Sequence, residues 1–249
     1  MIHFLWVMKM FFYTKDNIPD GYGFSTFGLT HLIWLAVGAL MCVGACLLYK
    51  KLSASGQKKM LIVLGCYIFF QEMLKNLIVA LVDEFTVGYL PFHLCGINIL
   101  LILFDVIKPT KIVRSFLYYF GIPGAMLALL FPNWTSQPLW NFFHLHSFLI
   151  HILLVMYPLL LVTSGQVQTD LKSAFKSLIV LVGFAIPIYF LNLLWDTNFM
   201  FLMEPDKGNP LELFETLLGS HLWGFPILLP VVIFLMYLPI LIVRRVKND

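Results

Sequence analysis

Long runs of apolar residues alternate with short polar stretches along the whole chain. Most runs approach or exceed the roughly 20 residues that an α-helix needs to cross a bilayer. Backbone groups in lipid must be hydrogen-bonded within their own segment, so we expect these runs to be helices. The pattern predicts seven membrane spans, at residues 24–49, 59–82, 90–107, 112–131, 140–163, 171–195 and 223–243.

The two longest segments outside these spans have features of their own. Residues 1–22 begin with an apolar stretch that Lys9 interrupts and that is too short to cross, so we expect a segment lying in the membrane interface. Residues 196–222 form the longest outer loop, in which "PLELFETLL" predicts a short amphipathic helix. No repeat of fixed period appears, so residues 1–249 are interpreted as a single transmembrane helical domain.

Composition and charge agree with this pattern. Hydrophobic residues make up 60% and charged residues 12% of the 249, and the mean hydropathy is +0.89. A soluble domain has about 25% charged residues, so we predict an all-α polytopic membrane protein. Lysine and arginine gather in the connections after the first, third and fifth spans and at the C-terminus. This bias predicts a protein of the cell membrane with its N-terminus outside and its C-terminus in the cytoplasm. The net charge of +3 therefore reflects membrane orientation and gives no sign of nucleic-acid binding.

Polar side chains within the spans fall in the half nearer the predicted outer surface. An ionisable group inside a membrane is costly and marks a functional site by default. We therefore expect one polar pocket, open to the outer leaflet or the exterior. Its candidate members are His31, Glu72, Lys75, His93, Cys95, Asn98, His144, His146, His151, Asn192, Asn198 and His221.

Spacing within two spans predicts local contacts. Glu72 and Lys75 are three positions apart, so their side chains can meet on one helix face. Such a pair either joins the helix bundle or orients a histidine or a lipid head group. In the fifth span His144 and His151 share a face while His146 points elsewhere, and these histidines serve either as hydrogen-bonding groups in the bundle or in catalysis.

Cys95 lies close to the start of the third span. Pro91 suits the first turn of a helix, which places Cys95 within the first turn or so, where the positive end of the helix dipole favours a thiolate. A histidine from the fifth span would complete a Cys–His nucleophile, and Asn98 on the same face could donate to an oxyanion. The alternatives are a buried structural cysteine and a zinc site shared with nearby histidines, although no zinc spacing such as HExxH occurs.

Several stretches, in this order, resemble a known family: "FGLTHL" around His31, "LPFHLC" ending at Cys95, "FFHLHSFLIH" ending at His151, "NFMFL" beginning at Asn198 and "GSHLWGFP" around His221. They are similar to the YwaF-like bacterial integral membrane proteins, relatives of the eukaryotic transmembrane protein 164 acyltransferases. The resemblance implies transfer of fatty acyl groups between phospholipids by a cysteine and a histidine. By position these are Cys95 and His151, with His144 and His146 as rivals. More distant relatives use a threonine and a histidine to cleave fatty-acid esters of hydroxy fatty acids.

The hypothesis from the sequence is therefore a membrane acyltransferase or lipid ester hydrolase that acts on phospholipid acyl chains through Cys95 and His151. Its partner would be a membrane phospholipid or lysolipid. We expect no cofactor and no metal, because the chain contains no glycine-rich phosphate loop, nucleotide motif or metal-ligand spacing; it also identifies no protein partner. The alternative is a non-enzymatic transporter, receptor or lipid-binding protein that uses the same polar residues as a ligand or proton site.

Overall fold

The structure, a computed structural model, describes residues 10–14, 17–19, 21–82, 85–167, 169–206 and 208–248, with side chains up to residue 241. Within these residues every regular element is helical, as predicted. The main helices are α2 (Leu29–Lys51), α3 (Ala54–Leu81), α4 (Leu94–Ile107), α5 (Lys111–Phe116), α6 (Ile122–Leu130), α7 (Phe142–Thr163), α8 (Leu171–Trp195), α9 (Pro210–Leu218) and α10 (Gly224–Asn248). Short 3-10 turns η1 (Val87–Tyr89), η3 (Phe199–Phe201) and η4 (His221–Trp223), and the π-helical turn η2 (Leu117–Gly121), lie between them.

Six helical segments are long and apolar enough to cross a membrane, which makes the chain a multi-pass membrane protein by length and composition. They are α2, α3, the continuous α5–η2–α6 segment, α7, α8 and the η4–α10 segment. The seventh predicted span, α4, has 14 residues and is about 21 Å long, against about 30 Å for the hydrocarbon core. The prediction of seven spans is thus supported for six of them, and α8 begins and ends at the predicted residues.

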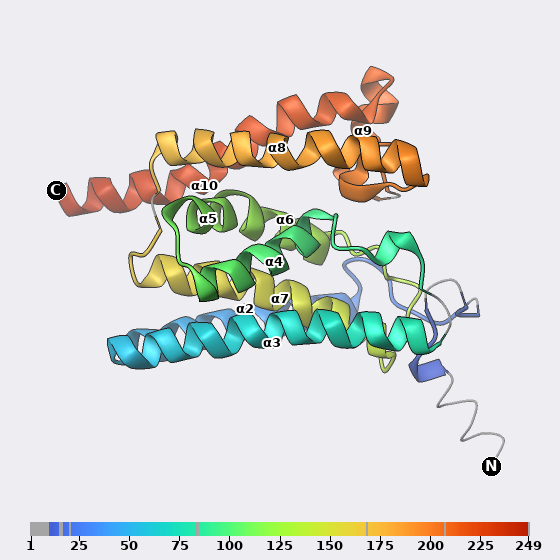
Figure 1. The fold of residues 1–249 in the computed structure, drawn as a ribbon, viewed down its shortest axis with the longest axis horizontal. Coiled ribbons are helices and arrows are strands. Elements are labelled where there is room, and N and C mark those ends of the chain that lie inside the picture. The colour runs from blue at the N-terminus through green and yellow to red at the C-terminus, as the bar shows by residue number, and fades with distance from the viewer. Residues whose placement is uncertain are drawn as a thin grey trace, which may run out of the picture.

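The long helices run back and forth along one axis (Figure 1). The α2–α3, α4–α5 and α7–α8 connections and the C-terminus lie at the left of this view, which we call the basic end. The turns η1, η3 and η4 and the helix α9 lie at the opposite end. Helix α7 is central: 67% of its apolar window is buried, against 22% or less for α2, α3, α8 and the η4–α10 segment.

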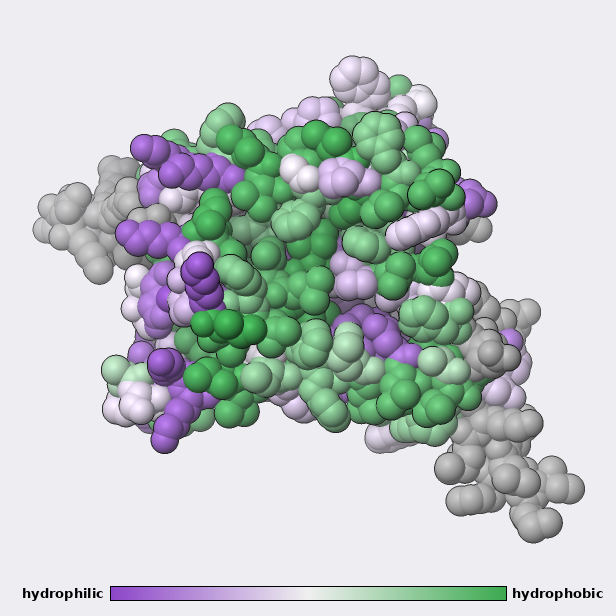
Figure 2. Space-filling model, in the orientation of Figure 1, coloured by the Kyte–Doolittle hydropathy of each residue, from purple (hydrophilic) through white to green (hydrophobic). Residues whose placement is uncertain are grey.

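The outer face of the bundle suits a lipid environment. Large apolar side chains are exposed along α2, α3, α8 and α10, and Figure 2 shows them as a nearly continuous hydrophobic surface, with hydrophilic side chains gathered at the basic end. A water-soluble monomer rarely exposes so large an apolar area. At the basic end the Asp170 side chain caps α8, and its hydrogen bond from the Ser173 backbone lowers the pKa of Asp170.

Helix α4 begins later than the sequence predicted, because Pro91 does not start it. Leu90, which precedes the proline, is extended as the proline ring requires, and the helix begins at Leu94 after the N-cap residue His93. Gly96 then packs against the turn: a Cβ atom there would lie 2.7 Å from the Cα of Pro91. This close approach fixes the start of α4, and with it the position of Cys95.

The fourth span is interrupted at its centre by the wide turn η2. Pro123 follows it within the first turn of α6, where its missing N–H removes one hydrogen bond of the regular helix. All five residues of η2 are buried. Single π turns of this kind are often found at functional sites, and this one packs against α4 and α7.

The described part of the N-terminal segment lies against the start of α7. Asn141 Nδ2 donates to the carbonyls of Met10 and Tyr13, and Phe142 packs against Phe11 and Phe12. Most of the segment predicted to lie in the membrane interface, residues 1–9 in particular, is outside the described residues.

Candidate functional site

A partly buried ion pair on α3 is the centre of the candidate site. Lys75 Nζ donates a hydrogen bond to Glu72 Oε1 at 2.5 Å, and these side chains are 20% and 8% exposed. The contact agrees with the spacing of three positions. Lys75 Nζ also lies 5.9 Å from the centre of the Tyr89 ring, within the range of a cation–π interaction. Figure 2 shows a hydrophilic patch within the hydrophobic surface beside the C-terminal half of α3, the half farther from the basic end.

Cys95 lies in the first turn of α4, and α4 packs against α3. Its thiol is free, packs against the hydrophobic core and lies within electrostatic range of both Glu72 and Lys75. A thiol in these surroundings needs a base to remove its proton before it can act as a nucleophile.

Two imidazoles on α7 complete the group. His151 lies within electrostatic range of Lys75, and His146 lies within range of both Lys75 and His151 and beside the Gln71 backbone. The sequence predicted that His146 points away from the face shared by His144 and His151; in the structure His146 lies beside the Gln71 backbone of α3, which packs along α7. Side chains from three helices in mutual contact, α3, α4 and α7, therefore gather around Lys75.

The hydrogen bond of His151 defines which nitrogen can act as a base. Nδ1 lies 2.6 Å from the carbonyl oxygen of Ser147. Because a carbonyl only accepts, Nδ1 carries the hydrogen and Nε2 of the neutral ring holds the free lone pair. The Trp134 ring stacks on the imidazole at 5.2 Å with an angle of 11° between the planes, which fixes the orientation of the imidazole.

The side-chain amide of Asn98 is buried without hydrogen-bond partners among the described residues. Asn98 is 1% exposed and lies one turn after Cys95. A Cβ atom at Gly121 would lie 3.4 Å from Asn98 Oδ1, so the π turn η2 passes directly beside the amide. His146 Nε2 is likewise buried without a partner. Leaving such atoms unpaired costs about 1–3 kcal/mol each, a cost that a polar ligand would remove.

Two other predicted members, His31 and His144, have structural roles. His31 accepts from the Phe27 backbone at 2.8 Å and donates to the Leu129 carbonyl at 2.6 Å. His144 accepts from the Trp34 indole at 3.0 Å and lies 3.3 Å from a backbone carbonyl of the loop before α7. Both ring nitrogens of each histidine are therefore engaged in joining α2, α6 and α7.

His93 and Asn198 support the turn η3. His93 Nδ1 accepts from the Met200 backbone at 3.3 Å, and its ring packs against Phe199. Asn198 Nδ2 donates to the Glu204 carbonyl at 2.9 Å. Asn192, 1% exposed, bonds both the N–H and the carbonyl of Phe199 from the last turns of α8.

His221 connects η4 to this same turn. Its Nδ1 lies 2.9 Å from Glu215 Oε2 on α9, and its Nε2 lies 3.1 Å from the Phe201 carbonyl. Both nitrogens thus face acceptors within the protein, and the histidine ties α9, η4 and η3 together.

The candidate polar residues thus do not all gather in one place. The structure divides the candidate members into three sets, and one of them combines a free thiol, an imidazole whose Nε2 holds a free lone pair, and unpartnered polar atoms. We call this set the Lys75 group: Glu72, Lys75, Cys95, Asn98, His146 and His151.

Sequence reasoning missed Trp134 and Tyr89, which contact the Lys75 group through a stacked ring and a cation–π contact. Both lie outside the predicted spans, and no spacing in the sequence links them to α3 or α7. An apolar groove of about 210 Å³ between α4 and α8 was also not predicted, and its α4 residues, including Ile97 and Leu101, lie on the face turned away from Cys95.

The alternative of a zinc site finds no support in the geometry of the described residues. Among them, no three histidine, cysteine, aspartate or glutamate side chains are arranged to hold a metal ion.

Comparison with known proteins identifies a family. The model of the TMEM164 family matches residues 26–240, which contain all of the Lys75 group. This match agrees with the transmembrane protein 164 part of the resemblance, whereas it does not test the narrower likeness to YwaF-like proteins. Searches of curated proteins and of solved structures found no match.

Proposed function

Because the chain belongs to the TMEM164 family, we propose that it is a membrane enzyme that transfers fatty acyl groups from a phospholipid to an acceptor through Cys95 and His151. The observation that carries the proposal is the Lys75 group itself. It places a free thiol and an unpartnered buried amide on α4, an imidazole with a free Nε2 on α7 and the Glu72–Lys75 ion pair on α3, and these three helices contact one another.

The chemistry follows from these side chains. His151 Nε2 takes the proton from the Cys95 thiol, and the sulfur attacks the carbonyl carbon of a lipid ester. The negative charge that develops on the carbonyl oxygen is stabilised by Asn98 Nδ2 and by the Lys75 ammonium. The ester C–O bond then breaks, the imidazolium returns its proton to the departing lysolipid oxygen, and an acyl-thioester remains on Cys95.

The second half repeats these steps in reverse order. The hydroxyl of an acceptor lysolipid gives its proton to His151 Nε2 and attacks the thioester carbonyl, and the Cys95 thiolate leaves and is reprotonated. With water as the acceptor, the same steps give a free fatty acid and the enzyme is a hydrolase. Glu72 holds the Lys75 ammonium in place through their hydrogen bond.

The proposed membrane orientation places this chemistry near the outer surface. The basic end carries Lys50, Lys108 and Lys172 and would face the cytoplasm of a cell membrane, with the N-terminus outside and α4 as a seventh, shorter crossing. The Lys75 group lies towards the opposite end, near the start of α4 and the end of α3 (Figure 1).

A carrier or transporter remains the second interpretation, since the unpartnered Asn98 and His146 atoms would also suit a bound polar head group. Paired broken helices would favour a transporter, but α8 continues through Pro187 as one helix of 25 residues. We therefore place the enzyme first.

The test compares two histidine variants in the full-length protein, reconstituted in phosphatidylcholine vesicles with a labelled acyl donor and a lysolipid acceptor. His151→Gln removes the base and should lower the transfer rate by roughly 10²–10⁴-fold. His146→Gln should have a much smaller effect, because the His146 ring lies beside the Gln71 backbone of α3 and is not held by the Ser147 carbonyl that orients the His151 ring. Equal thermal stability of the variants serves as the folding control.

If His146→Gln abolishes transfer and His151→Gln does not, the base is His146 and the assignment above is wrong. If both variants transfer acyl groups at the rate of the unsubstituted protein, the proposed function is contradicted.

A further inference from the structure

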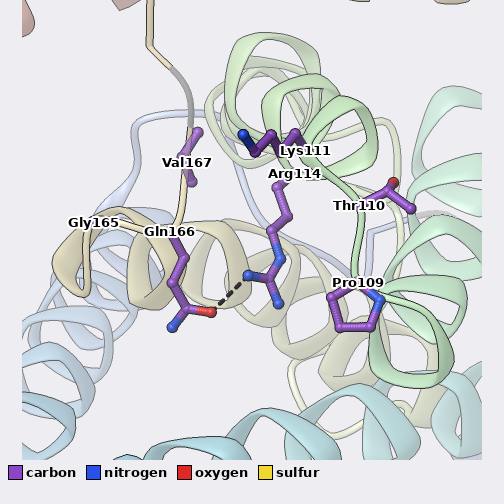
Figure 3. Close-up of a pocket in the computed structure, with 7 residues that line it drawn as sticks. All are labelled: Pro109, Thr110, Lys111, Arg114, Gly165, Gln166 and Val167. Carbon is purple, nitrogen blue, oxygen red and sulfur yellow. Dashed lines mark hydrogen bonds between the residues drawn. The ribbon is translucent and has the colours of Figure 1, made fainter.

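A second polar site lies at the basic end, far along the bundle from the Lys75 group. It is a cavity of about 410 Å³ between the α4–α5 connection and the α7–α8 connection (Figure 3). Pro109 and Thr110 line it from the first connection, Lys111 and Arg114 from the start of α5, and residues 165–167 from the second connection.

Arg114 is held in this cavity by a buried carboxylate. Its Nε donates to both oxygens of Asp105, at 2.8 and 3.1 Å, and Asp105 is 1% exposed. The hydroxyl of Tyr157, itself fully buried, donates to the same carboxylate at 3.0 Å. Burying a carboxylate is costly unless it is paired and hydrogen-bonded. Here the Arg114 guanidinium and the Tyr157 hydroxyl together satisfy the Asp105 carboxylate, and this holds Arg114 in place.

Hydrogen bonds also hold Gln166, on the α7–α8 connection at the opposite side of the cavity. Arg114 Nη1 donates to Gln166 Oε1 at 2.6 Å, the hydrogen bond drawn in Figure 3. The amide nitrogen of Gln166 donates in turn to the hydroxyl of the fully buried Tyr49 and to Ser164 Oγ. Among the described residues no hydrogen bond engages Arg114 Nη2, the third nitrogen of the guanidinium.

The charges in the cavity do not balance. Asp105 compensates Arg114, but no carboxylate lies among the lining residues to compensate the exposed Lys111. Asp170, the nearest acidic residue after Gln166 in the chain, is engaged in capping α8. The lining therefore presents one uncompensated positive charge together with a guanidinium nitrogen and the hydroxyl of Thr110.

We propose that this cavity binds a phosphate group. A fixed guanidinium with a neighbouring ammonium is the arrangement that recognises phosphate oxygens in proteins, the first by directed hydrogen bonds and the second as a point charge. The phosphate belongs either to the head group of an anionic lipid in the adjacent leaflet or to a soluble phosphorylated compound. The proposal does not depend on the acyl-transfer chemistry at Cys95.

The test uses Lys111→Gln in the full-length protein, because Lys111 is exposed and outside the buried network that holds Arg114. Lys172→Gln, at the exposed start of α8 outside the cavity, is the matched control. Binding of inorganic phosphate to the detergent-solubilised protein is measured by calorimetry. Retention of phosphatidylglycerol, from an equal mixture with phosphatidylcholine, is measured by native mass spectrometry.

Lys111→Gln should weaken binding by roughly fivefold or more, the loss expected for removing one charge a few ångströms from a phosphate at a partly exposed site, and Lys172→Gln should not. Weakened phosphatidylglycerol retention identifies a lipid head group as the source. Weakened phosphate binding with unchanged lipid retention identifies a soluble compound. The proposal is overturned if Lys111→Gln changes neither measurement, or if Lys172→Gln has the same effect.

Discussion

Replacing Cys95 with alanine should lower acyl transfer by roughly 10⁴-fold or more, to the background rate, because removal of a covalent nucleophile abolishes the reaction path it opens. The thiol packs in the core beside Glu72 and Lys75, and alanine is smaller than cysteine, so the fold should persist. The measurement is the rate at which the reconstituted protein moves labelled acyl chains from phosphatidylcholine to lysolipid.

The chain provides its own controls for this variant. Cys46 and Cys66 are free thiols on α2 and α3, outside the Lys75 group, and Cys46→Ala and Cys66→Ala should transfer at the unsubstituted rate. Equal loss in all three variants would point to a general effect of thiol removal. Full activity in Cys95→Ala would exclude Cys95 as the nucleophile.

Replacing Asp105 with alanine should lower the free energy of unfolding by about 3 kcal/mol, the lower end of the cost of breaking a buried ion pair. The substitution leaves Arg114 without its carboxylate partner, and it removes the acceptor of the hydroxyl of the fully buried Tyr157. We choose the lower end because Arg114 is 14% exposed and can turn partly towards water. Reversible unfolding of the protein in mixed micelles measures the difference.

Glu204→Ala serves as the control for this prediction, because Glu204 is exposed and its side chain makes no hydrogen bond among the described residues. It should change the unfolding free energy by less than about 0.5 kcal/mol. An equally small change in Asp105→Ala would mean that the buried network at the basic end contributes little to stability.

The sequence predicted the helices well because hydrophobic run length is a strong signal in membrane proteins. It could not predict the π turn η2 or the late start of α4. The π turn precedes Pro123, which lacks an N–H, and the late start of α4 depends on the close approach of Gly96 to Pro91 in the turn before the helix; hydrophobic run length reports neither. The Glu72–Lys75 pair was predictable because it depends only on spacing along one helix.

The sequence could not predict which polar residues meet, because depth along a helix says nothing about its rotation. His31 and His144 lie in the same predicted outer half as His151, yet both ring nitrogens of each bond to other groups. The Asp105–Arg114 ion pair was not predicted. Arg114 stands beside the basic connection between the third and fourth spans, and there its charge was interpreted only as a signal of membrane orientation. Only the packing of α4, α5 and α7 brings Arg114, Asp105 and Tyr157 together.

The most direct test of the account is the mass of the protein itself during turnover. After brief incubation with a phospholipid donor and no acceptor, acid quenching and intact mass spectrometry should detect the added mass of one acyl chain. Hydroxylamine should remove it, and peptide mapping should place it on Cys95. An acyl chain attached to another residue, or active transfer with no acyl-enzyme at any time point, would contradict a thioester at Cys95.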